Sequence, residues 1–423
     1  MSKVTPSLRF KEYKDKWTEN SFGKVSEFIN GKAYTQSELL DKGKYRVLRV
    51  GNLFSRNEWY YSDLELEKDK YIEAGDLIYA WSASFGPRFW REEKVIYHYH
   101  IWKVIPNEAI VDRLFLFHVL ASDVDRIKAV SQGGTMVHIT KGSIESRMLK
   151  LPLLPEQQKI ASFLSAVDEK IQQLTRKKEL LEQYKKGVMQ QLFRLNHDSS
   201  DLRDSPDVKV NQGNQKNHHQ SQFRPLRFKD ENGKDYPKWE EKRLGEVGNI
   251  ISGLTYSPND IHENGVLVLR SSNVQDRRLT FDDNVYVNVS PSDFNPVMEN
   301  DILICVRNGS KNLIGKNALI DKKNIGIAFG AFMTVYRSDF NCYLFHYFDT
   351  DNYKNEVHKN LGATINSING SDLKKFKVPF PSNDEQRKIA NFLSAIDTKI
   401  ETVTNQITQT QTFKKGLLQQ MFV

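Results

Sequence analysis

The stretch "EQQKIASFLSAVDEKI" at residues 156–171 returns as "EQRKIANFLSAIDTKI" at residues 385–400, with 12 of the 16 positions identical. Apolar residues in both copies recur at alternating spacings of four and three, the heptad pattern of helices that pack side by side. The pattern continues to Leu192 in the first copy and to Met421 in the second. The stretch therefore predicts two long helices whose apolar seams satisfy each other in an antiparallel pair.

The predicted seam is made of apolar residues at matching heptad positions. Its members are Ile160, Leu164, Val167, Ile171, Leu174, Leu181 and Val188 in the first helix, and Ile389, Leu393, Ile396, Ile400, Val403, Ile407 and Leu417 in the second. Four residues interrupt it, namely Lys178, Lys185, Thr410 and Lys414. Such interruptions either fix the register of the pairing or mark a place where the seam opens.

Two glycines fall inside the predicted helices, Gly187 in the first copy and Gly416 in the second. Glycine costs about 1 kcal/mol relative to alanine in a helix interior. We therefore expect either that the helices end at these positions or that another backbone approaches closely there.

The repeat extends beyond the helices. Residues 135–193 align with residues 364–422 at a constant offset of 229, and upstream "VLRVGNL" (47–53) corresponds to "VLRSSNV" (268–274). Short apolar runs rich in β-branched and aromatic residues predict strands in this upstream part, with one amphipathic helix per repeat at 111–127 and 342–357. The predicted fold class is α+β: two mixed α/β domains separated by two long antiparallel helices, in a pseudo-two-fold internal repeat.

The repeat sets the predicted domain boundaries. The first domain covers residues 1–154 and its helix 155–194, while the second domain covers 223–383 and its helix 384–423. Residues 195–222 are polar and contain no aromatic residue, so they cannot bury enough surface to offset their ordering entropy. We predict a linker there.

The composition allows two domains. With 39% apolar residues, a chain of 423 residues can build two cores.

The composition indicates an anionic partner. Lysine and arginine outnumber aspartate and glutamate by 61 to 53, and the pI is about 9.1, so nucleic acid is a plausible ligand. The chain shows neither a secretory signal nor the roughly 18 consecutive apolar residues of a membrane span. We expect a cytoplasmic protein with no membrane partner. Its two cysteines, Cys305 and Cys342, are expected to be buried thiols without a disulfide.

A search for catalytic and metal-binding motifs gives little. The stretch "GSKNLIGKN" (309–317) has five residues between its glycines where a P-loop needs four, and Asn317 replaces the hydroxyl that binds magnesium. His98 and His100 could form a metal pair, but no further ligands stand at a recognisable spacing, and groove-facing histidines fit better. The chain is predicted to bind no metal and not to be an enzyme by itself.

The remaining candidates are polar side chains of the kind that read DNA. Arginine, asparagine, serine and threonine contact base edges, and cationic side chains contact phosphates. The predicted DNA-binding residues are Arg49, Asn52, Ser82, Ser84, Arg88, Arg91, Thr135, His138 and Lys141 in the first repeat, and Arg270, Asn273, Arg307, Asn308, Ser310, Lys311, Asn312, Thr364, Asn366 and Ser367 in the second. Solvated loops and turns that only position the next segment remain the alternative. Arg49, Asn52, Arg270 and Asn273, at matching strand ends, can be structural in both repeats.

One order of motifs occurs twice and resembles a known family. The stretches "GTMVHITKGSIESRMLKLPLLPEQQKIASFLSAVDEKI" (134–171) and "GATINSINGSDLKKFKVPFPSNDEQRKIANFLSAIDTKI" (362–400) are similar to the specificity subunits of type I restriction-modification systems. In that family a Leu-Pro or Val-Pro strand precedes Glu-Gln and Ile-Ala-x-Phe-Leu. The resemblance covers nearly the whole chain and departs at 381–384, where "PSND" stands in place of "PLLP".

The resemblance implies a function. It implies a subunit that reads a bipartite, asymmetric site on double-stranded DNA, with one recognition domain per half-site and a gap set by the helices. It further implies two methyltransferase subunits that methylate adenine and two ATP-dependent restriction translocase subunits. Under this interpretation the chain binds no cofactor, and S-adenosylmethionine, ATP and Mg²⁺ are held by the partners. The alternatives are a coiled-coil scaffold without DNA and a fragment of a fused restriction-modification enzyme.

Overall fold

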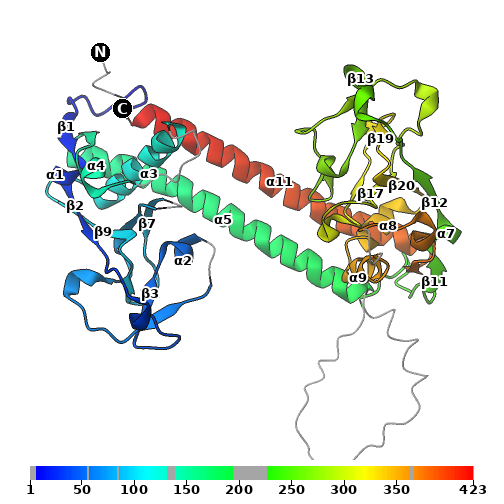
Figure 1. Ribbon diagram of the computed structural model, residues 1–423, viewed down its shortest axis with the longest axis horizontal. Helices are drawn as coiled ribbons and strands as arrows, with labels where there is room; N and C mark the ends of the chain where they lie inside the picture. The colour runs from blue at the N-terminus through cyan, green and yellow to red at the C-terminus, as the bar shows by residue number, and fades with distance from the viewer. Residues whose placement is uncertain are drawn as a thin grey trace, which may run out of the picture. The chain divides into compact units, whose positions relative to one another are not determined.

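The computed structural model describes residues 6–54, 57–82, 85–130, 139–193, 226–361 and 366–422 (Figure 1). The chain divides into two compact units: unit 1 comprises Met1–Lys177 with Val403–Val423, and unit 2 comprises Lys178–Thr402. Each unit thus contains one part of each long helix, α5 (Leu154–Phe193) and α11 (Asn383–Met421). The predicted linker lies outside the described residues, and the domain boundaries given above stay predictions.

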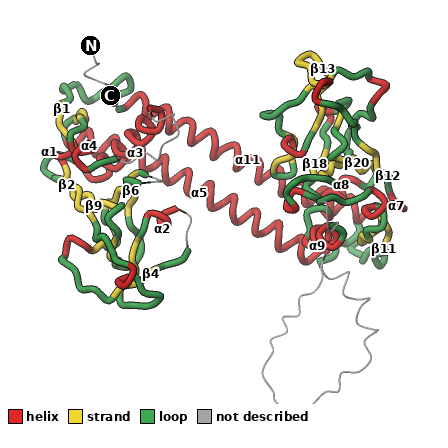
Figure 2. Tube along the Cα trace, viewed as in Figure 1, coloured by secondary structure: helices red, strands yellow, loops and turns green. Residues whose placement is uncertain are grey.

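Unit 1 is a mixture of short strands and helices (Figure 2). Its strands are β1 (Thr18–Ser21), β2 (Ser26–Asn30), β3 (Tyr45–Leu48), β4 (Tyr60–Ser62), β5 (Tyr71–Ile72), β6 (Leu77–Ala80), β7 (Gly86–Phe89), β8 (Val95–Tyr97), β9 (Ile101–Pro106) and β10 (Met148–Leu151), and its shorter helices are α1 (Phe22–Val25), α2 (Val50–Phe54), α3 (Arg113–Val130) and α4 (Lys141–Glu145). The strands form sheets with the orders β2-β9-β6-β7 and β4-β3-β8-β5, while β1 pairs with β10.

Unit 2 has the same kind of architecture. Its strands are β11 (Glu240–Arg243), β12 (Asn249–Ser252), β13 (Ile261–Leu269), β14 (Val274–Gln275), β15 (Arg278–Leu279), β16 (Tyr286–Val287), β17 (Ile302–Cys305), β18 (Asn317–Leu319), β19 (Ala328–Phe329), β20 (Met333–Arg337) and β21 (Lys377–Phe380), and its shorter helices are α7 (Leu244–Val247), α8 (Asn341–Tyr347), α9 (Asp351–Lys359) and α10 (Gly370–Leu373). The sheet orders are β12-β20-β17-β18 and β16-β13-β19, while β11 pairs with β21.

The two units share the arrangement of their main strands, while among the described residues the outer strand β5 occurs in unit 1 alone and the pair β14–β15 in unit 2 alone. The order β12-β20-β17-β18 matches β2-β9-β6-β7, and the pair β11–β21 matches β1–β10. The parallel pair β13–β19 likewise matches the parallel pair β3–β8 within otherwise antiparallel pairings. The predicted α+β fold with an internal repeat is therefore confirmed.

The long helices contribute their seams to the two cores. In unit 1, Ile160 and Leu164 of α5 share a core with Leu417 of α11, and in unit 2 the later Val188 of α5 shares a core with the earlier Leu393 of α11. The start of α5 thus lies beside the end of α11, which is the antiparallel arrangement expected. Every predicted seam residue is buried or half-buried. None of the described helices is long and apolar enough to cross a membrane.

Two of the lysines that interrupt the seam join the helices. Lys414 Nζ of α11 lies 2.5 Å from Asp168 Oδ1 of α5 in unit 1. Lys185 Nζ of α5 lies 2.7 Å from Asp397 Oδ1 of α11 in unit 2. The lysines are 229 positions apart, as are the aspartates. Because each ion pair forms only when these positions face one another, the interruptions fix the register of the helix pair.

Two local expectations were wrong. The segment 342–357 is not one helix: α8 ends at Tyr347 and α9 begins at Asp351, where the Thr350 hydroxyl accepts a hydrogen bond from the Tyr353 amide. A threonine that caps a new helix favours the break. Cys342 is exposed rather than buried, since it lies in the first turn of α8 on the outer side, whereas Cys305 is buried. Both cysteines are free.

The two helix glycines give the first testable prediction. A third expectation was also wrong, because the helices do not end at Gly187 and Gly416, and a Cβ atom at either position would meet no described atom within 4 Å. We therefore expect Gly187→Ala to stabilise unit 2 by about 0.5–1 kcal/mol, because alanine orders at lower entropic cost. Urea denaturation checks this. Gly315→Ala is the opposite control, since Gly315 has φ +82° and faces Val357; an unchanged Gly187→Ala variant would contradict the expectation.

Candidate nucleic-acid interface

Three of the predicted DNA-binding segments come together in unit 2. The Asn308 side chain donates to Ser271 Oγ at 3.0 Å, and its amide donates to the Asn366 carbonyl at 3.2 Å. In return, Asn366 Nδ2 donates to the Gly309 carbonyl at 2.9 Å. These bonds unite the loop after β13, the loop after β17 and the segment before α10. We call residues 270–273, 307–312, 330–332 and 366–367 the unit 2 patch.

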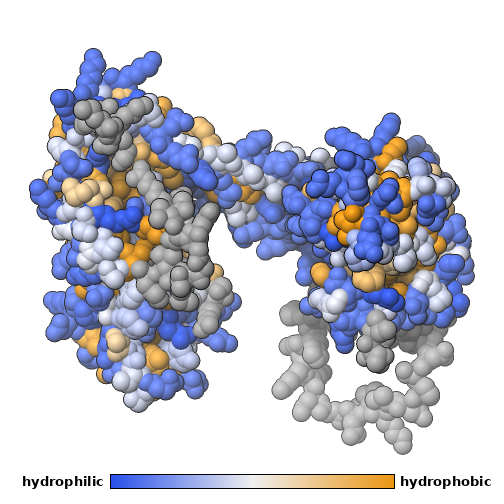
Figure 3. Space-filling model, turned by 45° about the horizontal axis from the view of Figure 1, so that its top comes forward, coloured by the Kyte–Doolittle hydropathy of each residue, from blue (hydrophilic) through white to orange (hydrophobic). Residues whose placement is uncertain are grey.

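The turn between β19 and β20 belongs to this patch, although the sequence did not single it out. The amides of Val306 and Arg307 both donate to the Phe332 carbonyl, at 3.0 and 3.1 Å. The Phe332 side chain is 57% exposed. In the sequence this residue lies within one continuous apolar run, so no pattern showed that it falls in a turn. On the face drawn in Figure 3, hydrophobic residues appear as small areas within a largely hydrophilic surface.

Unit 1 brings its corresponding loops together around the turn between β8 and β9. The His98 amide donates to the Leu48 carbonyl at the end of β3 (2.9 Å), and Trp81 Nε1, just after β6, donates to the Tyr99 carbonyl (2.8 Å). We call residues 49–54, 81–82, 88 and 98–100 the unit 1 patch. His98 and His100 therefore lie among the predicted reading loops. In the described part of the chain no group of three or more His, Cys, Asp or Glu is placed to hold a metal.

Three arginines of the patches share one arrangement. The guanidinium groups of Arg49, Arg88 and Arg307 lie over the rings of Tyr60 (4.0 Å), Phe54 (4.5 Å) and Phe332 (5.6 Å). Each guanidinium lacks a hydrogen-bond acceptor or ion-pair partner among the described residues. An aromatic ring orients the planar guanidinium while leaving its donors available. All three are among the DNA-binding residues that the sequence predicts.

The other arginines that lie over aromatic rings are occupied. Arg46 pairs with Glu92, Arg113 donates to the Gly75 carbonyl, Arg227 pairs with Glu385, and Arg277 donates to Asn317 Oδ1. An arginine over a ring is therefore normally held by an acceptor in this protein. Among the described arginines that lie over a ring, those of the two patches are the ones whose donors have no acceptor. Such donors suit binding to phosphate or to a base edge.

The asparagines at the strand ends shape the loops. Asn52 Oδ1 accepts from the Arg49 amide at 3.2 Å, and Asn273 Oδ1 accepts from the Arg270 amide at 2.9 Å. Asn273 is fully buried, and its Nδ2 donates to the Thr280 carbonyl. The same local turn thus follows β3 and β13. Arg270 differs from Arg49 in that its Nη2 donates to Asp283.

The structure places the remaining predicted residues as follows. Ser310, Lys311 and Asn312 are exposed in the unit 2 patch, with Ser367 bridged to Arg307; Ser82 is buried beside Trp81; Arg91 is exposed beyond β7; and Lys141 is exposed in α4, where it pairs with Glu145. Ser84, Thr135, His138 and Thr364 lie outside the described residues. The DNA-binding role of all these side chains stays a prediction.

The charge of the unit 1 patch comes from its arginines and not from His98. Burial lowers the pKa of His98 to about 4, and the nearby His100 and Arg49 lower it in the same direction. His98 is therefore neutral near pH 7. Because a neutral imidazole adds no positive charge, Arg49 stays in the patch without repulsion from this neighbour.

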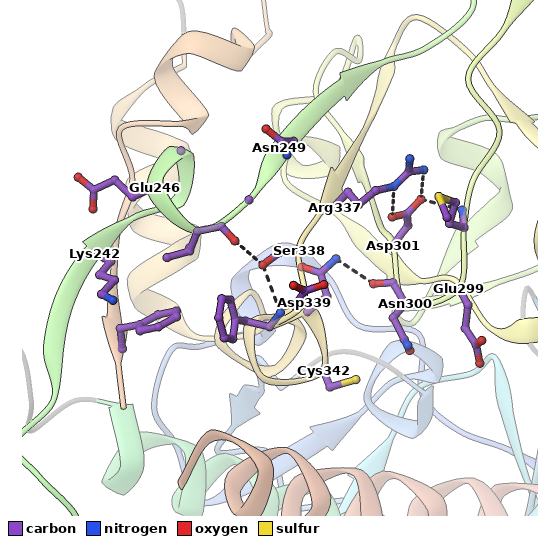
Figure 4. Close-up of a pocket in the computed structure, with 17 residues that line it drawn as sticks. Lys242, Glu246, Asn249, Glu299, Asn300, Asp301, Arg337, Ser338, Asp339 and Cys342 are labelled. Atoms are coloured by element: carbon purple, nitrogen blue, oxygen red, sulfur yellow. Dashed lines mark hydrogen bonds and ion pairs between the residues drawn. The ribbon is translucent and has the colours of Figure 1, made fainter. Parts of the chain in front are cut away.

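The residues drawn in Figure 4 line a hollow of about 780 Å³ in unit 2. Residues 298–301 of this lining precede β17, whereas the residues 307–312 of the unit 2 patch follow it. The lining includes Asn300 before β17 and Arg337 at the end of β20. The Arg337 guanidinium makes two hydrogen bonds to Asp301, and Asn341 Nδ2 donates to the Asn300 carbonyl. These hydrogen bonds join the strand ends to α8. No predicted DNA-binding residue lines the hollow.

Comparison of the sequence with known families gives a match in both repeats. The model described as "Type I restriction modification DNA specificity domain" matches residues 14–183 and 236–410. The chain is 26% identical to the type I restriction enzyme MjaVIII specificity subunit of Methanocaldococcus jannaschii, over 83% of this chain and 79% of that protein. It is 21% identical to the EcoBI specificity subunit of Escherichia coli, over 96% of this chain and 86% of that protein.

Comparison with solved structures gives the same fold. The S subunit of a type I restriction-modification system from M. genitalium matches over 99% of both chains, with a TM-score of 0.58 and 16% identity. A chain from a study of complex assembly and conformational transition of the type I R-M system matches over 95% of this chain and 96% of its own length, with a TM-score of 0.50 and 18% identity.

Proposed function

The chain belongs to the family of type I restriction-modification DNA specificity domains and is a specificity subunit of such a system, and we propose that it reads a bipartite, asymmetric DNA target. Unit 1 reads one half-site through the unit 1 patch, and unit 2 reads the other through the unit 2 patch. The two patches occupy matching places in the repeat but carry different side chains, as two readers of different sequences require.

The observation that carries this proposal is the state of the patch arginines. Arg49, Arg88 and Arg307 present guanidinium donors without an acceptor among the described residues. A guanine edge offers two acceptors to such a group, and a phosphate offers several. Asn308 and Asn366 hold the unit 2 loops together beside Arg307. The arrangement suits recognition of an anionic ligand with acceptors in fixed positions.

The chain acts with partner subunits. We propose that two methyltransferase subunits bind it and methylate adenine, and that two restriction translocase subunits join them, with S-adenosylmethionine, ATP and Mg²⁺ held by the partners. The internal repeat supports this stoichiometry, because two equivalent surfaces bind two copies of one partner. The patches hold donors and cations, which suit recognition, and we propose that the partners carry out the catalysis.

A binding experiment with two arginine variants tests the assignment of half-sites. Mapping methylated adenines with and without the gene defines the target, and the purified complex is then titrated with duplexes altered in one half. We expect Arg88→Ala and Arg307→Ala each to weaken binding about 10- to 100-fold and to relax discrimination in one half only, a different half for each. Binding should also fall steeply with salt.

The control is Arg243→Ala, because Arg243 is exposed in unit 2 but lies outside the patch. It should bind the target like the unmodified protein. The proposal fails if Arg88→Ala and Arg307→Ala relax the same half-site, or if Arg243→Ala loses as much affinity as Arg307→Ala. Loss of the gene without any change in the methylated adenines would favour the scaffold alternative.

A further inference from the structure

The Phe332 ring is an apolar group placed among polar readers. It lies in the turn between β19 and β20, and its 57% exposure leaves much of the ring in water. A single exposed apolar side chain is ordinary on a protein surface. What distinguishes Phe332 is its position. The Arg307 amide donates to its carbonyl, and Asn308 is the next residue of the same loop.

The backbone that carries the ring is fixed on all sides. Val306 and Arg307 donate to the Phe332 carbonyl, the Ala331 amide donates to Leu254 (2.8 Å), and the Gly330 amide donates to Leu269 (3.0 Å). The turn is thus tied to the loop after β17, to the segment after β12 and to the end of β13. A turn held in this way loses little further backbone entropy when it meets a ligand.

Arg307 is the charged side chain that lies over the ring. Its guanidinium carbon lies 5.6 Å from the ring centroid, and in the described chain this side chain has neither hydrogen-bond acceptor nor ion pair. Unit 1 repeats the arrangement with different elements: Arg88 of β7 lies 4.5 Å from the ring of Phe54, which is 41% exposed at the end of α2. An arginine with free donors beside an exposed phenylalanine therefore occurs in both patches.

The chemistry of the major groove offers a partner for each half of this pair. A guanine edge presents two acceptors to an arginine, and the one apolar group in the groove is the 5-methyl of thymine. Resting on the proposed function, we propose that Phe332 is a specificity-determining residue of unit 2: its ring packs on the methyl group of a thymine next to the guanine that Arg307 binds.

The pair reads two neighbouring bases as a unit. Arg307 stays over the ring while it donates to guanine, so the guanidinium and the ring reach adjacent base pairs together. Uracil and cytosine lack the methyl group, which leaves part of the ring without a contact. Burying one methyl group is worth about 0.8 kcal/mol, so the selectivity expected from Phe332 is about fourfold per site.

A double-mutant cycle between protein and DNA tests this. The assembled complex, unmodified or with Phe332→Ala, is titrated with duplexes in which each thymine of the half-site assigned to unit 2 is replaced by uracil in turn. With Phe332 present, we expect one replacement to weaken binding about three- to fivefold. With Phe332→Ala, the same replacement should have no effect. Uracil in the other half-site should act equally on both proteins.

Two further variants separate this role from a structural one. Phe332→Leu keeps an apolar side chain and should retain part of the sensitivity to the methyl group. Ile325→Ala removes another exposed apolar side chain of unit 2, 53% exposed and at the opposite end of β19, and should keep the full sensitivity. Phe332→Ala should leave recognition of the other half-site unchanged. A variant with a misfolded unit 2 would instead fail to bind the target.

Distinct results overturn the inference. It is wrong if every uracil replacement is silent with the unmodified complex, if Phe332→Ala keeps the sensitivity, or if the half-site of unit 2 contains no thymine. A thymine that becomes reactive to permanganate only when Phe332 is present would show a ring inserted between bases instead. In all these cases the complex still binds its target, whereas a complex that binds no DNA would remove the proposed function itself.

Discussion

Replacing Glu385 by alanine should destabilise unit 2 by about 3–5 kcal/mol, because a buried ionic network loses its carboxylate. Glu385 is fully buried in the first turn of α11. It accepts two hydrogen bonds from Arg227, at 2.8 and 2.9 Å, and one from Trp239 Nε1 at 2.8 Å. Without the carboxylate, the guanidinium and the indole N–H lose their partner inside the protein. Urea denaturation followed by hydrogen exchange in unit 2 measures the loss.

The same replacement in the other repeat should act on the other unit. Glu156 is 1% exposed and pairs with Arg9 Nε at 2.6 Å, so Glu156→Ala should destabilise unit 1. The matched control is Asp384→Ala, whose exposed carboxylate pairs with Arg387 one turn along α11. An exposed pair is worth at most about 1 kcal/mol. Equal effects of Asp384→Ala and Glu385→Ala would refute a special role for the buried glutamate.

These glutamates also show what the opening stretch does in the fold. Ser382 and Glu385 have the spacing of a capping box, and the Glu385 amide approaches Ser382 Oγ at 3.5 Å. The carboxylate itself reaches Arg227 instead, 158 residues away in the chain. Local spacing predicts a cap, but only the folded chain shows that an upstream arginine reaches the same carboxylate. The repeated glutamate therefore anchors the start of each long helix to its unit.

The candidate site was predictable in type and less so in arrangement. Hydrophobic periodicity and the internal repeat fixed the helices, the seam and the general place of the reading loops, because these depend on residues close in sequence. The role of Phe332 could not be predicted, since its place depends on hydrogen bonds between the loop after β17 and the turn after β19. Asn273 shows the converse: its residue type suits base contact, but the fold buries it to shape a turn.

Lowering the pH from about 6.5 to 5 should destabilise both units through one buried histidine each. Burial lowers the pKa of His118 to about 4 and that of His346 to about 3. In an unfolded chain a histidine has a pKa of about 6.5. Below that value the unfolded chain takes up a proton that the folded chain refuses, so stability falls with the pH. Each histidine should cost about 2 kcal/mol at pH 5.

The surroundings explain why neither imidazole is protonated. His118 Nε2 lies 3.2 Å from Ser165 Oγ, and its Nδ1 is 3.9 Å from Asp168, which would favour the charged form. Lys414 pairs with that same carboxylate and acts against the imidazolium. In unit 2, Lys185 and Arg277 lower the pKa of His346 after burial, while Asp349 raises it. Burial is the main cause for both histidines, and the lysines that hold the helices in register lower the two pKa values further.

Variants of the histidines and lysines separate these causes. His346→Gln should lose stability at pH 7.5 but show a flatter decline of unit 2 between pH 6.5 and 5, while unit 1 keeps its slope. Lys414→Met removes the cation that opposes the His118 imidazolium and leaves Asp168 beside it, so the pKa of His118 should rise toward its ordinary value. Because the folded and unfolded pKa values then converge, unit 1 should lose less stability per pH unit. Hydrogen exchange resolved by unit measures both slopes, and slopes that do not change in either variant would place the acid sensitivity in other groups.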